Sequence, residues 1–170
     1  KDGAAGLQTF QVAVANVNDA PAITSAAVTA ATEEQVYTYN ATASDDDLLN
    51  PSGEQLTWSL TAAPAGMAIN PSTGQVTWTP TNAQAAQSHN VTVKVQDNAA
   101  VSSTQSFTVA VANVNDAPAI TSTAVTAATE ETAYAYQVTA TDDDLGNPSG
   151  EELTYSLTAS PSGMTINAST

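Results

Sequence analysis

The sequence contains no cysteine, no arginine, two lysines and a single histidine among its 170 residues. The absence of cysteine excludes disulfides, thiolate metal sites and cysteine nucleophiles, although an extracellular protein does not require disulfides. With one histidine and no cysteine, no base-and-nucleophile pair is evident, so we expect a protein that is not an enzyme.

Basic residues and long apolar runs are also scarce. Nucleic acids and anionic membrane surfaces are bound by clustered lysine and arginine, so the sequence argues against both as partners. No run reaches the roughly 18 apolar residues of a membrane-spanning helix, and no signal peptide opens the chain, so we expect no direct membrane insertion.

The charge that is present is acidic and confined to a few places. The 17 acids give a formal net charge of −15. Acidic surfaces improve solubility, and a solvated acidic loop remains an alternative reading. However, the predicted outward strand faces carry threonine, serine, glutamine and asparagine instead. Apart from Asp2, the acids are Asp19, Glu33, Glu34, Asp45, Asp46, Asp47, Glu54, Asp97, Asp116, Glu130, Glu131, Asp142, Asp143, Asp144, Glu151 and Glu152.

The chain repeats itself with an offset of 97 residues. The word Asn-Val-Asn-Asp-Ala-Pro at 16–21 returns at 113–118, and residues 116–170 match 19–73 at 41 of 55 positions. A fixed period indicates one folding unit used repeatedly. We therefore predict the last strand of one repeat at 1–18, a complete repeat at 19–115 and the N-terminal part of another at 116–170, in an excerpt of a longer protein.

Apolar residues alternate with polar ones throughout the repeat, which is typical of half-buried β-strands. Pro- and Gly-rich turns separate the strands, for example at 51–53 and 64–66. This pattern predicts an all-β fold of tandem immunoglobulin-like, seven-stranded β-sandwiches in a linear array. Parity assigns Trp58 and Trp78 to the core, whereas His89 is expected at an exposed strand edge. The predicted strands are 22–28, 35–43, 55–61, 67–70, 75–79, 90–96 and 105–112, with a loop at 83–86.

In such a sandwich the acids converge on the junctions between repeats. Asp45–Asp47 and Asp97 are expected at the end where Asn18 and Asp19 enter, and Glu33 at the opposite end, near 113–116. On an extended segment Asp45 and Asp47 would point the same way, and Asp46 would point elsewhere.

Clustered carboxylates repel one another unless a positive charge lies between them, and two lysines cannot supply it. Oxygen ligands without histidine or cysteine favour a hard cation, and Ca²⁺ with 6–8 oxygens fits best. The spacing after Asp45 does not match an EF-hand loop, because Asn50 and Leu56 stand where glycine and glutamate are needed. The candidate metal ligands are Asn16, Asn18, Asp19, Glu33, Asp45, Asp47, Asp97, Asn113, Asn115, Asp116, Glu130, Asp142 and Asp144.

Several motifs follow one another in order along the chain: the connector Asn-Val-Asn-Asp-Ala-Pro, Thr32-Glu33-Glu34 before a strand, Asp45 and Asp47 after it, the stretch 63–74 and Asp97. In these motifs the chain resembles the cadherin-like repeats of bacterial surface proteins, particularly the dystroglycan-type group. The resemblance implies a rod of tandem sandwiches stiffened by Ca²⁺ in large adhesins. Animal cadherins have aspartate where Asn16 and Asn113 stand and asparagine where Ala20 and Ala117 stand. Fewer charged ligands favour one or two weakly held ions per junction.

We therefore expect a non-enzymatic extender repeat of an extracellular, bacterial cell-surface protein, whose partners are the neighbouring repeats of its own chain. One alternative is a carbohydrate-binding module, which needs exposed aromatic rings such as Trp58. Another is self-association with like repeats on another molecule. Paired carboxylates can hydrolyse glycosides, but here they recur at every junction rather than in one cleft.

Overall fold

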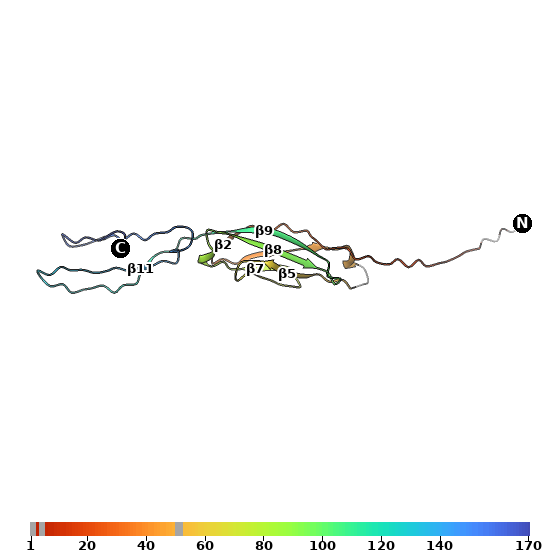
Figure 1. The fold of residues 1–170 in the computed structure, drawn as a ribbon, viewed down its shortest axis with the longest axis horizontal. Coiled ribbons are helices and arrows are strands. Elements are labelled where there is room, and N and C mark those ends of the chain that lie inside the picture. The colour runs from red at the N-terminus through yellow and green to blue at the C-terminus, as the bar shows by residue number, and fades with distance from the viewer. Residues whose placement is uncertain (1–2, 4–5, 50–52) are drawn as a thin grey trace.

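Two β-sheets face each other across a core in the central part of the chain (Figure 1). The computed structural model describes residues 3, 6–49 and 53–170, so the turn predicted at 51–53 lies outside the described residues except for Gly53. The strands here are β1 (Ala22–Ile23), β2 (Ala30–Thr32), β3 (Tyr37–Asn40), β4 (Ala43–Ser44), β5 (Thr57–Ala62), β6 (Ala68–Ile69), β7 (Gln75–Trp78), β8 (Ser88–Gln96) and β9 (Ser102–Ala112).

One sheet has the strand order β2-β9-β8-β5 and the other has the order β3-β7-β6. The hairpin of β8 and β9 carries the longest ladder, from the pair Ser88↔Ala110 to the pair Gln96↔Ser102. The side chains that alternate inward from both sheets, such as Val76, Val93 and Val109, have no exposed surface. The prediction of an all-β, immunoglobulin-like sandwich is confirmed.

The first predicted strand, at 22–28, is wrong as a single element. β1 pairs with β4 in a separate two-stranded sheet, and the chain then crosses to the four-stranded sheet, where β2 runs parallel to β9. Side chains satisfy the backbone of the crossing segment: the Tyr37 hydroxyl donates to Val28 O at 2.7 Å and Gln105 Nε2 donates to Ser25 O at 2.9 Å. Burial, followed by the nearby Tyr39, raises the pKa of the Tyr37 phenol to about 12.

The aromatic residues lie in the core, as parity predicted for both tryptophans. Trp58 and Trp78 are 6% and 2% exposed. Each large side chain removed from water contributes roughly 1.5–3 kcal/mol to folding. The prediction for His89 is wrong, because it is half-buried, its ring lies 5.2 Å from that of Trp78, and its Nε2 lies 2.8 Å from Gln84 O.

Two short 3-10 turns interrupt the strands, η1 (Asp46–Leu49) and η2 (Asn82–Gln84). η2 overlaps the first half of the segment predicted as a loop at 83–86. η1 directly follows Asp45, where an extended segment was expected. No helix in the described ranges is long and apolar enough to cross a membrane.

Residues 116–170 repeat several hydrogen bonds of residues 19–73 at the same offset; for example, Thr121 N donates to Thr139 O as Thr24 N donates to Thr42 O. The strands β10 (Ala119–Ile120) and β11 (Ala140–Thr141) pair in the register of β1 and β4. Within the described part of 116–170 these are the only assigned strands. In Figure 1 this segment lies at one end of the sandwich and the N-terminal segment runs away from the other end.

Candidate metal centre

The connector at 113–116 is held by carboxylates from both sides. Glu33, which directly follows β2, accepts a hydrogen bond from Val114 N at 2.5 Å. Two residues later, Asp116 N donates to Asp144 Oδ2 at 2.7 Å. Glu33 is 2% exposed and Asp144 is fully buried. The connector is therefore fixed by one acid that precedes it and one that follows it in the sequence.

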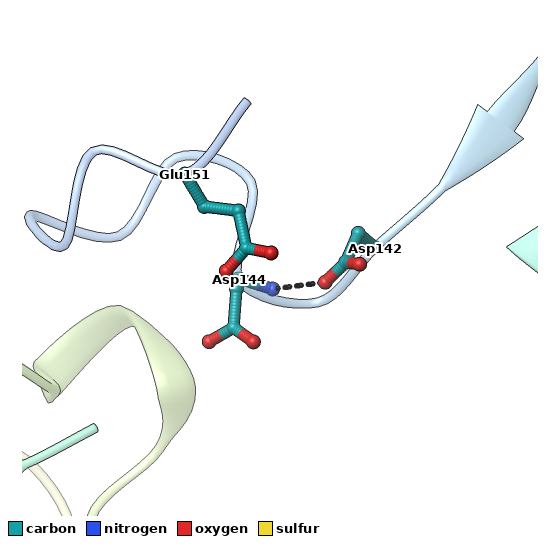
Figure 2. Close-up of side chains that lie close together, drawn as sticks. All are labelled: Asp142, Asp144 and Glu151. Carbon is teal, nitrogen blue, oxygen red and sulfur yellow. Dashed lines mark hydrogen bonds between the residues drawn. The ribbon is translucent and has the colours of Figure 1, made fainter. Parts of the chain in front are cut away.

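Three acids after the connector form a compact cluster (Figure 2). Asp142 follows β11, and its Oδ1 accepts a hydrogen bond from Asp144 N at 3.0 Å. Glu151 returns from the next turn and brings its carboxylate toward the other two. One oxygen from each of the three carboxylates lies within 4.8 Å of the others. We call these three residues the acidic cluster.

The acidic cluster concentrates negative charge, and in the described part of the chain no lysine belongs to it. Two unit charges 4 Å apart near a protein surface repel by about 4 kcal/mol. Burial, and then the charges of Asp142 and Asp144, raise the pKa of the Glu151 carboxyl above its ordinary value. Among the residues described, Asp142 Oδ2 and Glu33 Oε2 are buried and have no hydrogen-bond partner.

These features fit a hard divalent cation. Buried carboxylate oxygens without partners are costly unless an ion or donor compensates them. Calcium–oxygen distances are about 2.3–2.6 Å, so two ligands of one ion can be up to about 5 Å apart. The 4.8 Å spacing of the cluster oxygens is within that reach. Asp142, Asp144 and Glu151 could therefore hold Ca²⁺ through oxygen alone.

Asparagine side chains surround Asp144 and link three parts of the chain. Asn147 Nδ2 donates to Asp144 Oδ1 at 2.9 Å, and it also lies 2.5 Å from Asn113 Oδ1 and 3.2 Å from Asn82 Oδ1. Asn82 lies in η2 and Asn113 in the connector. A polar network therefore joins the sandwich to the segment that follows it.

The first connector has a matching arrangement. Asp19 N donates to Asp47 Oδ2 at 2.9 Å, and Asp47 N donates to Asp45 Oδ1 at 2.9 Å. Asp97 Oδ2 accepts a hydrogen bond from Asn18 Nδ2 at 2.9 Å. Asp45 Oδ2 is buried and has no hydrogen-bond partner in the described ranges. The structure thus brings Asn18, Asp19, Asp45, Asp47 and Asp97 together.

The prediction that Asp45–Asp47 form an extended segment is wrong. The chain turns into η1 after Asp45 instead of staying extended. The Asp45 carboxylate accepts the Asp47 backbone N–H and so stabilises this turn. Asp46 is exposed, as expected for the middle residue.

Other predicted ligands are not gathered in this way. Asn16 is exposed on the N-terminal segment, and Glu130 is exposed in a turn of the segment after the connector. Asn115 is exposed, and its Nδ2 donates to Asp116 O at 2.7 Å.

Sequence reasoning missed Glu151 and Asn147, although the repeat contains a signal for both. Glu151 repeats Glu54, and Asn147 repeats Asn50, which lies outside the described residues. Glu54 Oε1 accepts a hydrogen bond from Asn98 N at 2.7 Å. The carboxylate of Glu151 instead faces Asp142 and Asp144.

Comparison with protein families gives one match. The family model described as Putative Ig domain matches residues 20–112 and again residues 117–170. These two ranges cover most of the chain. No curated protein matches this sequence.

Several solved structures resemble the chain at low identity. Cadherin domains EC1-2 of human protocadherin-24 are 22% identical over 74% of this chain and 61% of that one, with a TM-score of 0.47. The SrpA adhesin from Streptococcus sanguinis is 14% identical over 59% of this chain and 63% of that one, with a TM-score of 0.44.

An endo-fucoidan hydrolase of glycoside hydrolase family 107, MfFcnA4, is 21% identical over 56% of this chain, with a TM-score of 0.45. The chain spans only 14% of the length of that enzyme. Likenesses of this size say nothing of a shared ligand or activity.

Proposed function

The chain belongs to the Putative Ig domain family, and from that premise we propose that it is a non-enzymatic structural or adhesive repeat whose junctions are made rigid by Ca²⁺. The proposed setting is a large extracellular protein at a bacterial surface, with the neighbouring repeats as its first partners. The proposed ligands at the second connector are the three residues of the acidic cluster, and Glu33, Asn113 and Asp116 are proposed to hold the connector beside it.

One observation carries the proposal. Asp142 is 9% exposed and belongs to a cluster of like charge, and its Oδ2 is buried without a hydrogen-bond partner among the described residues. Folding would not favour such an atom unless a cation offsets the desolvation and the repulsion. Lys94 lies within β8 and does not belong to the acidic cluster, so it does not supply the compensating charge.

The mechanical consequence follows from the connector contacts. Asp144 belongs to the acidic cluster and also accepts the Asp116 backbone N–H. An ion that fixes the Asp144 carboxylate therefore also fixes the start of the following segment. Without the ion, repulsion within the cluster favours looser arrangements, and the angle between the two segments would vary.

Calcium titration tests the proposal. The metal-free chain should bind Ca²⁺ with a dissociation constant on the order of 10⁻⁴–10⁻³ M, as in extracellular modules with few charged ligands. Asp142→Asn should weaken the binding at this connector by removing a buried ligand charge. Isothermal titration calorimetry measures both constants, and small-angle scattering with calcium and with chelator measures the maximum dimension.

Asp143→Asn is the matched control, because it removes the same charge from an exposed neighbour. Equal losses for Asp142→Asn and Asp143→Asn would show diffuse ion attraction instead of a site. A scattering profile that does not change between calcium and chelator would refute the rigidifying role.

The carbohydrate-binding alternative has lost its main support. Trp58 and Trp78, which would have formed a stacking platform, are core residues. The Trp78 Nε1 donates to Ala65 O at 3.2 Å, which further fixes its ring inside the sandwich.

A further inference from the structure

The carboxamide of Asn147 occupies an unusual position between the sandwich and the segment that follows. It is 6% exposed, and its Nδ2 lies among Asn113 Oδ1, Asp144 Oδ1 and Asn82 Oδ1. Its Oδ1 accepts a hydrogen bond from Ser149 N at 2.8 Å. Because a backbone N–H needs an acceptor, this bond defines which end of the amide faces the cluster, and that end is the nitrogen.

Three oxygens from three separate segments therefore converge on one nitrogen at 2.5–3.2 Å. An amide nitrogen has only two hydrogens, so it cannot give each oxygen a separate hydrogen bond. Convergence of oxygens on a partially positive centre is the arrangement that a bound cation also produces, at slightly shorter distances. Asn82 Nδ2, 3.5 Å from Asp144 Oδ1, adds a second amide to the same carboxylate.

We propose that Asn147 substitutes for a second cation at this junction and directly bridges η2, the connector and the loop after Asp144. This amide bridge does not depend on metal at the acidic cluster, and it fixes part of the orientation when no ion is bound. The neutral amide of Asn147 thus takes the place of a cation that would otherwise have to be bound from solution.

The amide bridge predicts opposite behaviour for two substitutions. Asn147→Ala removes the donor and leaves three oxygens without it, so the junction loosens whether or not calcium is present. Asn147→Asp keeps the acceptor for Ser149 N but replaces the donor with a carboxylate oxygen. Four oxygens then face one another, so Asn147→Asp should need a divalent cation to restore the orientation.

Distances between two spin labels measure the orientation directly. The chain has no cysteine, so Thr77→Cys and Thr123→Cys, both at exposed positions, give one label on each side of the connector. In chelator, the amide bridge still restrains part of the orientation, so the distance distribution should be broader for Asn147→Ala than for the unsubstituted chain. A distribution for Asn147→Ala as narrow as that of the unsubstituted chain would overturn the proposal.

Asn167 supplies matched controls, because its Oδ1 accepts a hydrogen bond from Ser169 N in the same local turn, at an exposed position. Asn167→Ala and Asn167→Asp should give the same distribution in chelator as the unsubstituted chain. Asn82→Ala removes the η2 oxygen that accepts from Asn147 Nδ2, and it should broaden the distance distribution as Asn147→Ala does. If Asn147→Ala fails to fold, the comparison of Asn82→Ala with the unsubstituted chain tests the amide bridge instead.

The calcium arm separates this inference from the proposed function. Asn147→Asp should give a broader distribution than the unsubstituted chain in chelator, become narrow with Ca²⁺, and bind one further ion in calorimetry, whereas Asn167→Asp should do none of these. An Asn147→Asp chain whose distribution in chelator is as narrow as that of the unsubstituted chain would refute the substitution for a cation. If the unsubstituted chain binds no calcium, the proposed function fails. The comparison of the label distances of the unsubstituted chain and Asn147→Ala in chelator still tests whether the amide bridge holds the junction.

Discussion

Glu151 is the acid whose charge the ion-free junction disfavours. Burial and the neighbouring Asp142 and Asp144 raise the pKa of its carboxyl, so the folded chain binds this proton more tightly than the unfolded chain. Without metal, the stability of the fold should therefore fall as the pH rises from the ordinary glutamate range through the raised pKa. With calcium the dependence is reversed, because the ion needs the deprotonated carboxylate.

Glu151→Gln should remove both effects. In chelator the variant should be more stable than the unsubstituted chain at neutral pH, because the repulsion with Asp142 and Asp144 is gone. In calcium it should bind more weakly, and its affinity should lose the decline that acidification causes. Thermal unfolding in chelator and calorimetry between pH 4 and 7 measure these changes.

Glu152→Gln, at the exposed adjacent position, is the control and should change neither quantity appreciably. Lower stability of Glu151→Gln than of Glu152→Gln in chelator would contradict the repulsion argument.

At the residue scale, the sequence could predict some members of the site and could not predict others. Acids repeated at a fixed offset pointed to Asp142 and Asp144, because their positions relative to the connector recur. Asn147 and Glu151 could not be assigned, because side chains with a local role and side chains that cross a junction look the same in a sequence. Glu54 and Glu151 occupy equivalent positions, and only the contacts show that they face different partners.

At the scale of elements, the turn between β6 and β7 fixes how closely the two sheets approach. Gly74 has φ +72°, and a Cβ built there would lie 2.6 Å from Ala41 O and 2.9 Å from Trp58 Cε2. A side chain would therefore meet both an unfavourable backbone conformation and fixed atoms of the core.

Gly74→Ala should lower the free energy of unfolding by about 2–5 kcal/mol. Left-handed backbone costs a non-glycine residue about 1–2 kcal/mol, and overpacking adds typically 1–3 kcal/mol. Gly66→Ala separates the two terms, because Gly66 has φ +84° but its nearest neighbour would be 3.8 Å away. It should cost only about 1–2 kcal/mol. Urea unfolding of both variants measures the difference, and equal losses would show that close packing at Gly74 is unimportant.

Elements also differ in how far the sequence determines them. The alternation of apolar residues predicted β3, β5, β7, β8 and β9, since period-two burial follows directly from strand geometry. It could not predict the division into β1 and β2, because alternation does not tell which sheet a segment joins. The hydroxyl of Tyr37 on the following strand β3 and the amide of Gln105 on the distant strand β9 support that crossing.

At the scale of the whole molecule, the acidic cluster and the connector have separable roles. All three cluster acids lie after the connector, within residues 142–151. The connector is held by Glu33 at Val114 and by Asp144 at Asp116, only two residues apart. Ion binding and stiffness should therefore become uncoupled when the distance between these two contacts changes.

Insertion of Gly-Gly between Val114 and Asn115 tests this separation. Two added residues can extend the connector by about 7 Å, so the two contacts can no longer hold the sandwich and the following segment in one orientation. Calcium affinity at the acidic cluster should stay close to its original value, because its ligands remain together. The label distances between positions 77 and 123 should become broad even in saturating calcium. The same insertion between Ala159 and Ser160, in an exposed bend, should leave the distances narrow. If the connector insertion abolished calcium binding instead, ligands from both sides of the connector would be required, and the ion would itself span the junction.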